Sequence, residues 1–163
     1  MTIPLTNVID PQDYEFTSLK LMEEFLTEFF NTTGFDASLE TIERTLATPL
    51  TKPILFFFIS GGTSRQTGGV GQDAVNRNLW GEYKDLIWDF RLVTDDATGG
   101  ALTLSKYAGH LDYIFRKYQF HLAKNGLRKS LVSPPIPLNT DEFYQKSFTV
   151  TNQALLCWET NSA

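Results

Sequence analysis

The chain has 163 residues and a formal net charge of −5, a length that suits one domain burying about two thirds of its unfolded surface. The acidic balance argues against a protein that grips nucleic acid through its phosphates, because that mode needs a clustered basic face. A single cysteine, Cys157, excludes an intrachain disulfide, and the sequence has no Cys/His cluster with metal-ligand spacing. We therefore expect a single domain over residues 1–163 that needs no cofactor and no metal ion.

Neither end nor middle of the sequence suggests a membrane segment. The first ten residues lack the basic region and apolar run of a signal peptide. No stretch approaches the roughly twenty apolar residues that a membrane span needs. We expect no membrane association.

The first predicted element is a helix from Asp10 to about Asn31. Asp10 suits the cap and Pro11 the first helical position. Apolar residues then recur at helical spacing on one face: Phe16, Leu19, Met22, Leu26, Phe29 and Phe30. A short second helix is predicted after a cap at Asp36 or Ser38, with Leu39, Ile42 and Leu46 on one side.

Residues 54–59 form an unbroken apolar run, ILFFFI. The run is rich in β-prone residues and too short for a helix, so it predicts a strand covered on both faces. Helices can cover one face. The other face has no evident cover within a domain of this size, which suggests a neighbouring subunit.

Residues 60–83 are rich in Gly, Ser, Thr, Gln and Asn and show no regular period. This predicts a long flexible loop between the first two strands, and loops of this length tend to be functional or to order on a partner. Residues 85–94 follow as a half-buried strand with clean alternation. Asp95 and Asp96 then suit a turn before Gly99 and Gly100.

The longest predicted helix spans residues 103–124. One apolar stripe runs down it, made of Leu104, Tyr107, Ala108, Leu111, Ile114, Phe115, Tyr118 and Leu122. Asn125 and Gly126 mark its end. Strands are predicted over residues 127–133 and 144–158. The fold class that follows is α+β: a mainly antiparallel four-stranded sheet packed by an N-terminal helix and this long central helix.

No catalytic group of residues emerges. The segment GVGQDA (residues 69–74) matches a dinucleotide-type G-x-G-x-x-A by letter, but no helical stripe follows it. His110 and His121 lie about three turns apart on the central helix, too far for one site. Basic residues between Arg116 and Lys129 gather at a helix end, where cations are favourable against the dipole. We expect no enzymatic activity, although a small-molecule-binding or nucleotide-binding enzyme that uses the glycine-rich loop remains an alternative.

The order of elements, the helix end FHLAKNGL (residues 120–127) and the strand FYQKSFTVT (residues 143–151) resemble the tail terminator and tail-completion proteins of long-tailed bacteriophages. This resemblance implies a virion protein, assembled in the host cytoplasm, that forms a hexameric ring. The ring would join the tail tube protein to the head-side connector protein, with DNA passing through without specific binding. Another neck or head-completion component is the alternative within the same class.

The resemblance and the loop together define candidate contact residues. Trp80 and Tyr83 are the expected anchors, because aromatic side chains bury large area with few rotatable bonds. Arg65 and Arg77 are expected to pair with acids of a neighbour. These four residues in the loop are the predicted interface.

Overall fold

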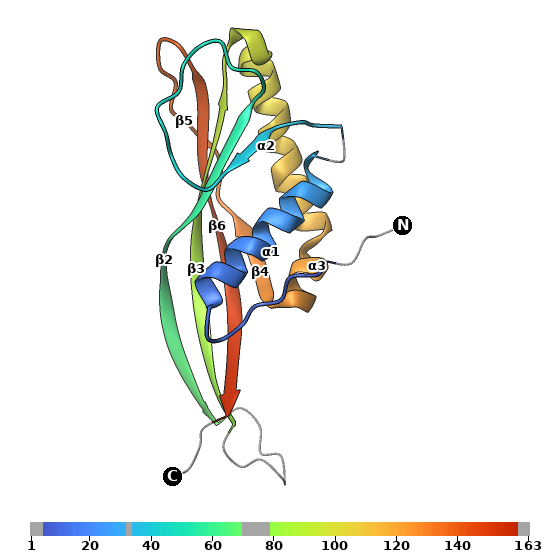
Figure 1. Ribbon diagram of the computed structural model, residues 1–163, viewed down its shortest axis with the longest axis vertical. Coiled ribbons are helices and arrows are strands. Elements are labelled where there is room, and N and C mark those ends of the chain that lie inside the picture. Colours follow the sequence, from blue (N-terminus) through green and yellow to red (C-terminus); the bar gives the residue numbers. More distant parts are fainter. Residues whose placement is uncertain (1–4, 32–33, 70–78, 160–163) are drawn as a thin grey trace.

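The computed structural model describes residues 5–31, 34–69 and 79–159 (Figure 1). Its helices are α1 (Tyr14–Phe29), α2 (Gly100–Lys117) and α3 (Gln119–Asn125), with a 3-10 turn, η2 (Asp96–Thr98). Its strands are β1 (Ser38–Glu40), β2 (Ile54–Gly69), β3 (Leu79–Thr94), β4 (Leu127–Val132), β5 (Ile136–Pro137) and β6 (Tyr144–Glu159). The fold is thus α+β, as expected, but the sheet differs from the predicted one.

The sheet over the described residues is six-stranded and mixed, so the predicted four-stranded antiparallel sheet is wrong. Its strand order is β1-β2-β3-β6-β4, and β5 pairs with β6 off this path. β1 pairs with β2 in parallel, whereas every other pairing is antiparallel. The two strands that the sequence did not predict, β1 and β5, are only three and two residues long.

The predicted loop between the first two strands is also wrong over most of its length. β2 runs on to Gly69 and β3 begins at Leu79, so most of residues 60–83 forms a long hairpin. These residues have weak β propensity, but every residue of β3 has a register partner on β6. This central position of β3 outweighs the composition of the hairpin. Residues 70–78 lie outside the described part of the chain.

The short second helix predicted after Asp36 or Ser38 is not present. Residues 38–40 form β1 instead, paired with Ile54–Phe56. The apolar residues that suggested one helical face go to different places: Leu39 packs against the core under the helices, Leu46 packs on the opposite face of the sheet, and Ile42 is exposed. Helical spacing here did not reflect a shared face.

The central helix is confirmed in its apolar stripe but not in its continuity. Six of the stripe residues are buried in α2 and Leu122 is buried in α3. Tyr118 separates the two helices with φ −107° and ψ 16°, and its ring stacks on Phe29 of α1 with centroids 4.2 Å apart. The break lets α3 turn onto α1. The predicted end is confirmed, because Gly126 follows α3 with φ 120°.

The main hydrophobic core lies between the three helices and one face of the sheet, around Phe25, Phe57, Trp88, Phe90 and Phe115. On the opposite face a smaller cluster of Ile54, Phe56, Val93 and Phe143 packs against Leu46 and Leu50. Both faces of residues 54–57 are therefore covered, as predicted. The cover on the second face comes from the chain itself, so it gives no reason to invoke a neighbouring subunit.

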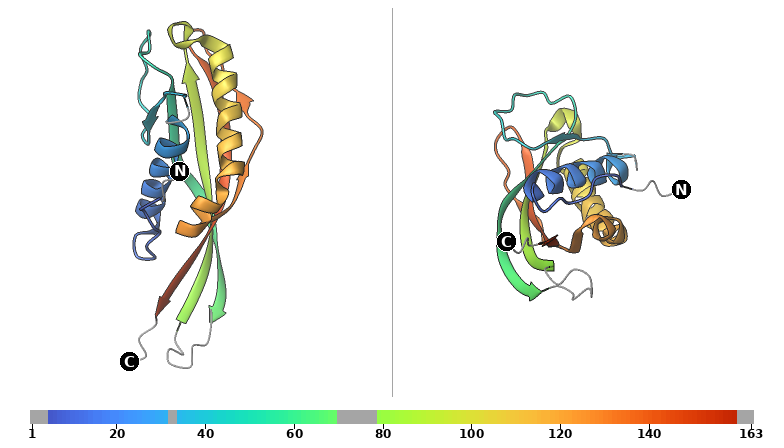
Figure 2. Two further views of the ribbon diagram at one scale, coloured as in Figure 1. Left: turned by 90° about the vertical axis from the view of Figure 1, so that its right-hand side faces the viewer. Right: turned by 60° about the horizontal axis from the view of Figure 1, so that its bottom comes forward.

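The helices cover only part of the sheet. β2, β3 and β6 are each 16 residues long, and their far halves extend past α1 and α3 as a twisted three-stranded ribbon (Figures 1 and 2). Within the described residues, no helix has the length and apolar character of a membrane span. The uncovered ribbon is the feature of the fold that most needs an explanation.

A candidate interaction surface

The ribbon consists of residues 63–69 of β2, 79–85 of β3 and 153–159 of β6, and we call it the arm. Its base is fixed by the register that aligns Thr63, Asp85 and Gln153 across the three strands. The Thr63 hydroxyl lies 3.2 Å from a carboxylate oxygen of Asp85. At Gly62 the strands approach so closely that an added Cβ would lie 2.5 Å from the Asp85 carbonyl oxygen. Glycine therefore supports the pairing here, although its abundance suggested a loop.

Both edges of the arm are open in the described structure. β1 pairs with β2 only at Ile54–Phe56, which leaves residues 57–69 of β2 without a second neighbour among the described strands. On the other edge β4 pairs with β6 no further than Ala154, so residues 155–159 are also open. A long open edge presents unpaired backbone N–H and C=O groups and is a template for pairing with another chain.

The β2 edge is not perfectly regular. Its register to β3 shifts between Ile59 and Gly61 and again between Gln66 and Gly68. Such bulges increase local twist and limit indiscriminate pairing of an edge. The two bulges therefore restrict the twist and register of any strand that could pair with this edge.

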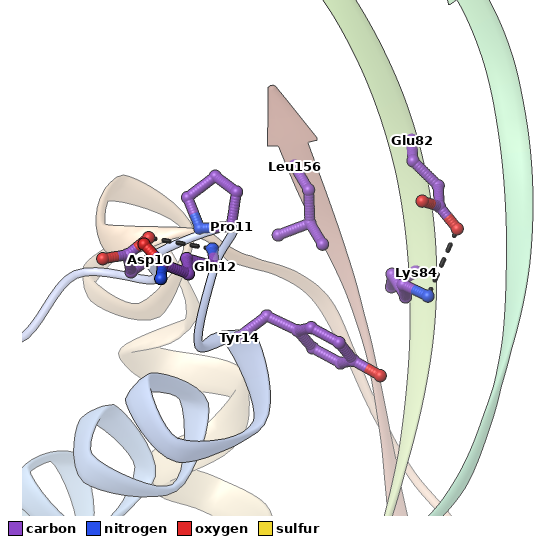
Figure 3. A pocket seen from close by; sticks show the side chains of 7 residues that line it. All are labelled: Asp10, Pro11, Gln12, Tyr14, Glu82, Lys84 and Leu156. Carbon is purple, nitrogen blue, oxygen red and sulfur yellow. Dashed lines mark hydrogen bonds and ion pairs between the residues drawn. The ribbon is translucent and has the colours of Figure 1, made fainter. Parts of the chain in front are cut away.

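A cleft of about 590 Å³ separates the arm from the start of α1 (Figure 3). Asp10, Pro11, Gln12 and Tyr14 line one side, and Glu82, Lys84 and Leu156 line the other. Lys84 Nζ lies 3.2 Å from a Glu82 carboxylate oxygen and 5.0 Å from the centre of the Tyr14 ring. The ion pair lies within β3, and the contact with Tyr14 joins the start of α1 to the base of the arm.

The structure brings three of the four predicted interface residues into the arm. Arg65 on β2 lies directly opposite Tyr83 on β3, and Trp80 on β3 lies opposite Gly69 on one side and Trp158 on the other. Arg77 lies outside the described residues. Sequence reasoning placed these residues on a loop, so it missed that they belong to paired strands with fixed spacing.

Only Gly69 of the GVGQDA segment (residues 69–74) lies in the described part of the chain. Gly68 and Gly69 end β2, and the next described element is the antiparallel strand β3 rather than a helix. A pyrophosphate-binding loop requires the N-terminus of a following helix. Among the described residues no group of three or more His, Cys, Asp and Glu side chains is placed to hold a metal ion.

Comparison with protein-family models and with curated proteins returned no match to this chain.

Proposed function

We propose that this protein is a structural virion protein that assembles into a closed ring at the head-tail junction of a long-tailed phage, as a tail terminator does. The observation that carries the proposal is the arm, a three-stranded ribbon with both edges open that continues past the helices, with only its base, at Ala154 and Leu156, buried in the main core. A monomer would leave these edges exposed to uncontrolled pairing. A subunit of an assembly would cover them.

The two open edges support a ring over a simple dimer. One belongs to β2 and the other to β6, so the arm of one copy can pair its β2 edge with the β6 edge of the next. A contact between two different surfaces is heterologous, and repeated heterologous contacts close into rings when the rotation allows it. Six copies is the number that the resemblance implies.

The tail tube and the head-side connector are the proposed partners, and Arg65, Trp80 and Tyr83 are the proposed contact residues on the arm. A ring with net negative charge lets DNA pass without holding its phosphates. Another neck component would use the same ring and arm. It would differ in binding the connector rather than the tube.

Electron microscopy of the purified protein mixed with isolated tail tubes tests the proposal. We expect rings in the protein alone and density that caps one end of each tube in the mixture. Rings that bind only the connector would favour the second neck component. Dispersed single subunits, with bare tube ends at every protein concentration, would contradict both forms of the proposal.

A further inference from the structure

The chain carries two surfaces of opposite charge outside the arm. The first is the acidic surface, which we define by Asp13, Glu15 and Glu23 of α1 and its cap, with Phe16 among them. Residues 10–28 contain six carboxylates and one lysine. The three named carboxylates are exposed, and Phe16 is 61% exposed. Only Glu23 among them forms an ion pair with a described residue, at 3.4 Å from Lys20 on the same helix.

The second is the basic surface, which we define by Lys124 of α3 and by Arg128 and Lys129 of β4, with Phe120 one turn before Lys124 on α3. Residues 106–129 contain six basic side chains and one carboxylate, Asp112. That carboxylate is bound by Arg116 of its own helix at 3.0 Å. The three residues that define the surface are exposed and make no ion pair with another described residue. Phe120 is 72% exposed.

Backbone geometry helps to present the basic surface. The register between β4 and β6 shifts between Arg128 and Leu131. Within this irregular stretch the backbone of Lys129 has φ 53°, a conformation that residues other than glycine seldom adopt. A bulge of this kind redirects a side chain away from the regular alternation of its strand.

We propose that neighbouring copies of this chain contact one another by placing the acidic surface of one copy against the basic surface of the next. This inference rests on the proposed ring and names the contact that would close it. Each surface combines an exposed phenylalanine with surrounding charges, which is the anatomy of an interface with an apolar anchor and a polar rim. The acidic surface also holds Lys20, whose Nζ lies 3.4 Å from Glu23 and 5.8 Å from the centre of the Phe16 ring. Its net charge is still opposite to that of the basic surface, which makes a second copy the fitting occupant.

The topology allows this contact and the arm contact to form in the same step. Glu15 lines a depression with Ser60 and Gly61 of β2, which places the acidic surface at the β2 side of the sheet. β4, which carries Arg128 and Lys129, is the last strand at the other end of the order β1-β2-β3-β6-β4. A neighbour that approaches the β2 edge with its own β6 and β4 side therefore brings basic groups toward α1.

Duplex DNA is the other macromolecule that a basic surface could bind. The overall charge of −5 opposes that mode, because the rest of the chain repels phosphates. In the proposed contact the basic residues are covered by the neighbour. DNA binding by this surface is therefore an outcome of the test that would count against the inference.

Paired charge reversals test the contact. One variant carries Glu15→Lys and Glu23→Lys, and the other carries Lys124→Glu and Arg128→Glu. A third variant, Asp141→Lys with Glu142→Lys, reverses two exposed carboxylates on the turn before β6 and serves as a control. Circular dichroism and thermal unfolding check that each variant is folded. Light scattering across a range of protein concentrations measures assembly.

In either variant alone, the reversed surface should repel the unchanged surface of its neighbour. We expect the protein concentration at which half of the chains are assembled to rise by about tenfold or more. An equal mixture of the two variants should assemble again, because alternating copies restore attraction at every contact of an even-numbered ring. The control variant should assemble as the intact protein does. High salt should weaken the intact ring.

Three results would overturn the inference. Assembly of both reversed variants at the intact level would show that the contact lies elsewhere, while the proposed ring would stand. Failure of the mixture to reassemble would show that the two surfaces do not meet. Loss of DNA binding in the Lys124→Glu, Arg128→Glu variant, with assembly unchanged, would assign the basic surface to DNA. An intact protein that stays monomeric would instead defeat the proposed function and this inference together.

Discussion

Asp95 links the segment that covers the opposite face of the sheet, around Leu50, to the end of β3. It is buried at the end of β3, and one carboxylate oxygen accepts a hydrogen bond from the Leu50 amide at 2.7 Å. The other oxygen accepts from the amide and the hydroxyl of Thr98 at 3.0 and 2.9 Å. Burial by itself would raise the pKa of Asp95, but these hydrogen bonds together hold the pKa below its ordinary value.

Replacing Asp95 with alanine is expected to destabilise the protein by about 2 to 4 kcal/mol, because the half-buried Leu50 amide loses its acceptor and Thr98 loses its hydrogen bonds to the carboxylate. Urea unfolding followed by tryptophan fluorescence measures the change. Asp141→Ala is the matched control, since Asp141 is exposed. Equal stability of the two variants would mean that the Asp95 contacts contribute nothing measurable.

Acid should unfold the protein through Asp95 and a second carboxylate, Glu24. Burial tends to raise the pKa of Glu24, but amides and side chains of Asn7 and Thr6 outweigh it and lower the pKa. A carboxylate with a lowered pKa in the folded state stabilises that state above its ordinary pKa of about 4, and the stabilisation is lost as pH falls through the folded value. We expect stability to be level near neutral pH and to fall below about pH 5.

A Glu24→Gln variant tests the contribution of Glu24 to this pH dependence. The Glu24→Gln variant should show a shallower loss of stability between about pH 5 and pH 2 than the intact protein, because one of the groups that takes up a proton on unfolding is gone. Thermal melting at a series of pH values measures both slopes. Parallel slopes in the two proteins would rule out Glu24 as a contributor.

Residue types predicted the local role of Asp95 but not its distant contact. Its position before Asp96 and two glycines indicated a turn, and it does cap η2 through Thr98. The contact with Leu50, 45 positions away, depends on how residues 41–53 cross the sheet. No sequence pattern in that segment encodes the crossing.

At the scale of elements, regular apolar spacing predicted the structure well. The stripe of α2 and the alternation of β3 appear as buried residues in the core. The predicted face of α1 is buried at Met22, Leu26 and Phe29, but Phe16 at its start is exposed. The arm was missed because its β2 and β3 segments are rich in glycine and polar residues and show no alternation, whereas its β6 segment was predicted as a strand. Their pairing depends on neighbours that are distant in sequence, above all β6.

The candidate site was likewise predicted from the sequence only in part. Composition singled out residues 60–83 as a contact region, and three of the four named residues lie in the arm. Sequence gave no sign that the region is a ribbon with two open edges. The sequence predicted the basic residues between Arg116 and Lys129 only as cations at a helix end, and it did not single out the acidic surface.

Shortening the arm should leave the fold intact and abolish assembly. Replacing residues 65–83 with Asn-Gly joins Ser64 to Lys84, which are register partners, by a two-residue hairpin turn. Of the buried residues of the main core, only Leu156 lies beyond this point, and the variant retains it on β6, so we expect the variant to melt within a few degrees of the intact protein. It should remain monomeric at concentrations where the intact protein assembles.

At the scale of the whole molecule, we expect assembly to reduce DNA binding. The proposed contact covers the basic surface, so the assembled protein should bind duplex DNA only weakly at physiological salt. Fluorescence anisotropy of labelled duplex DNA across a range of salt concentrations measures this. Tight binding with a steep salt dependence would favour a nucleic-acid-binding protein over a ring through which DNA passes.

The most direct test of the account is the mass of the intact protein in solution beside that of the arm-shortened variant, measured by light scattering over the same range of concentrations. The account predicts a closed assembly of about six copies for the intact chain, as the resemblance implies for a ring of heterologous contacts, and a monomer for the folded variant. A monomeric intact protein, or an assembly that survives removal of the arm, would contradict it.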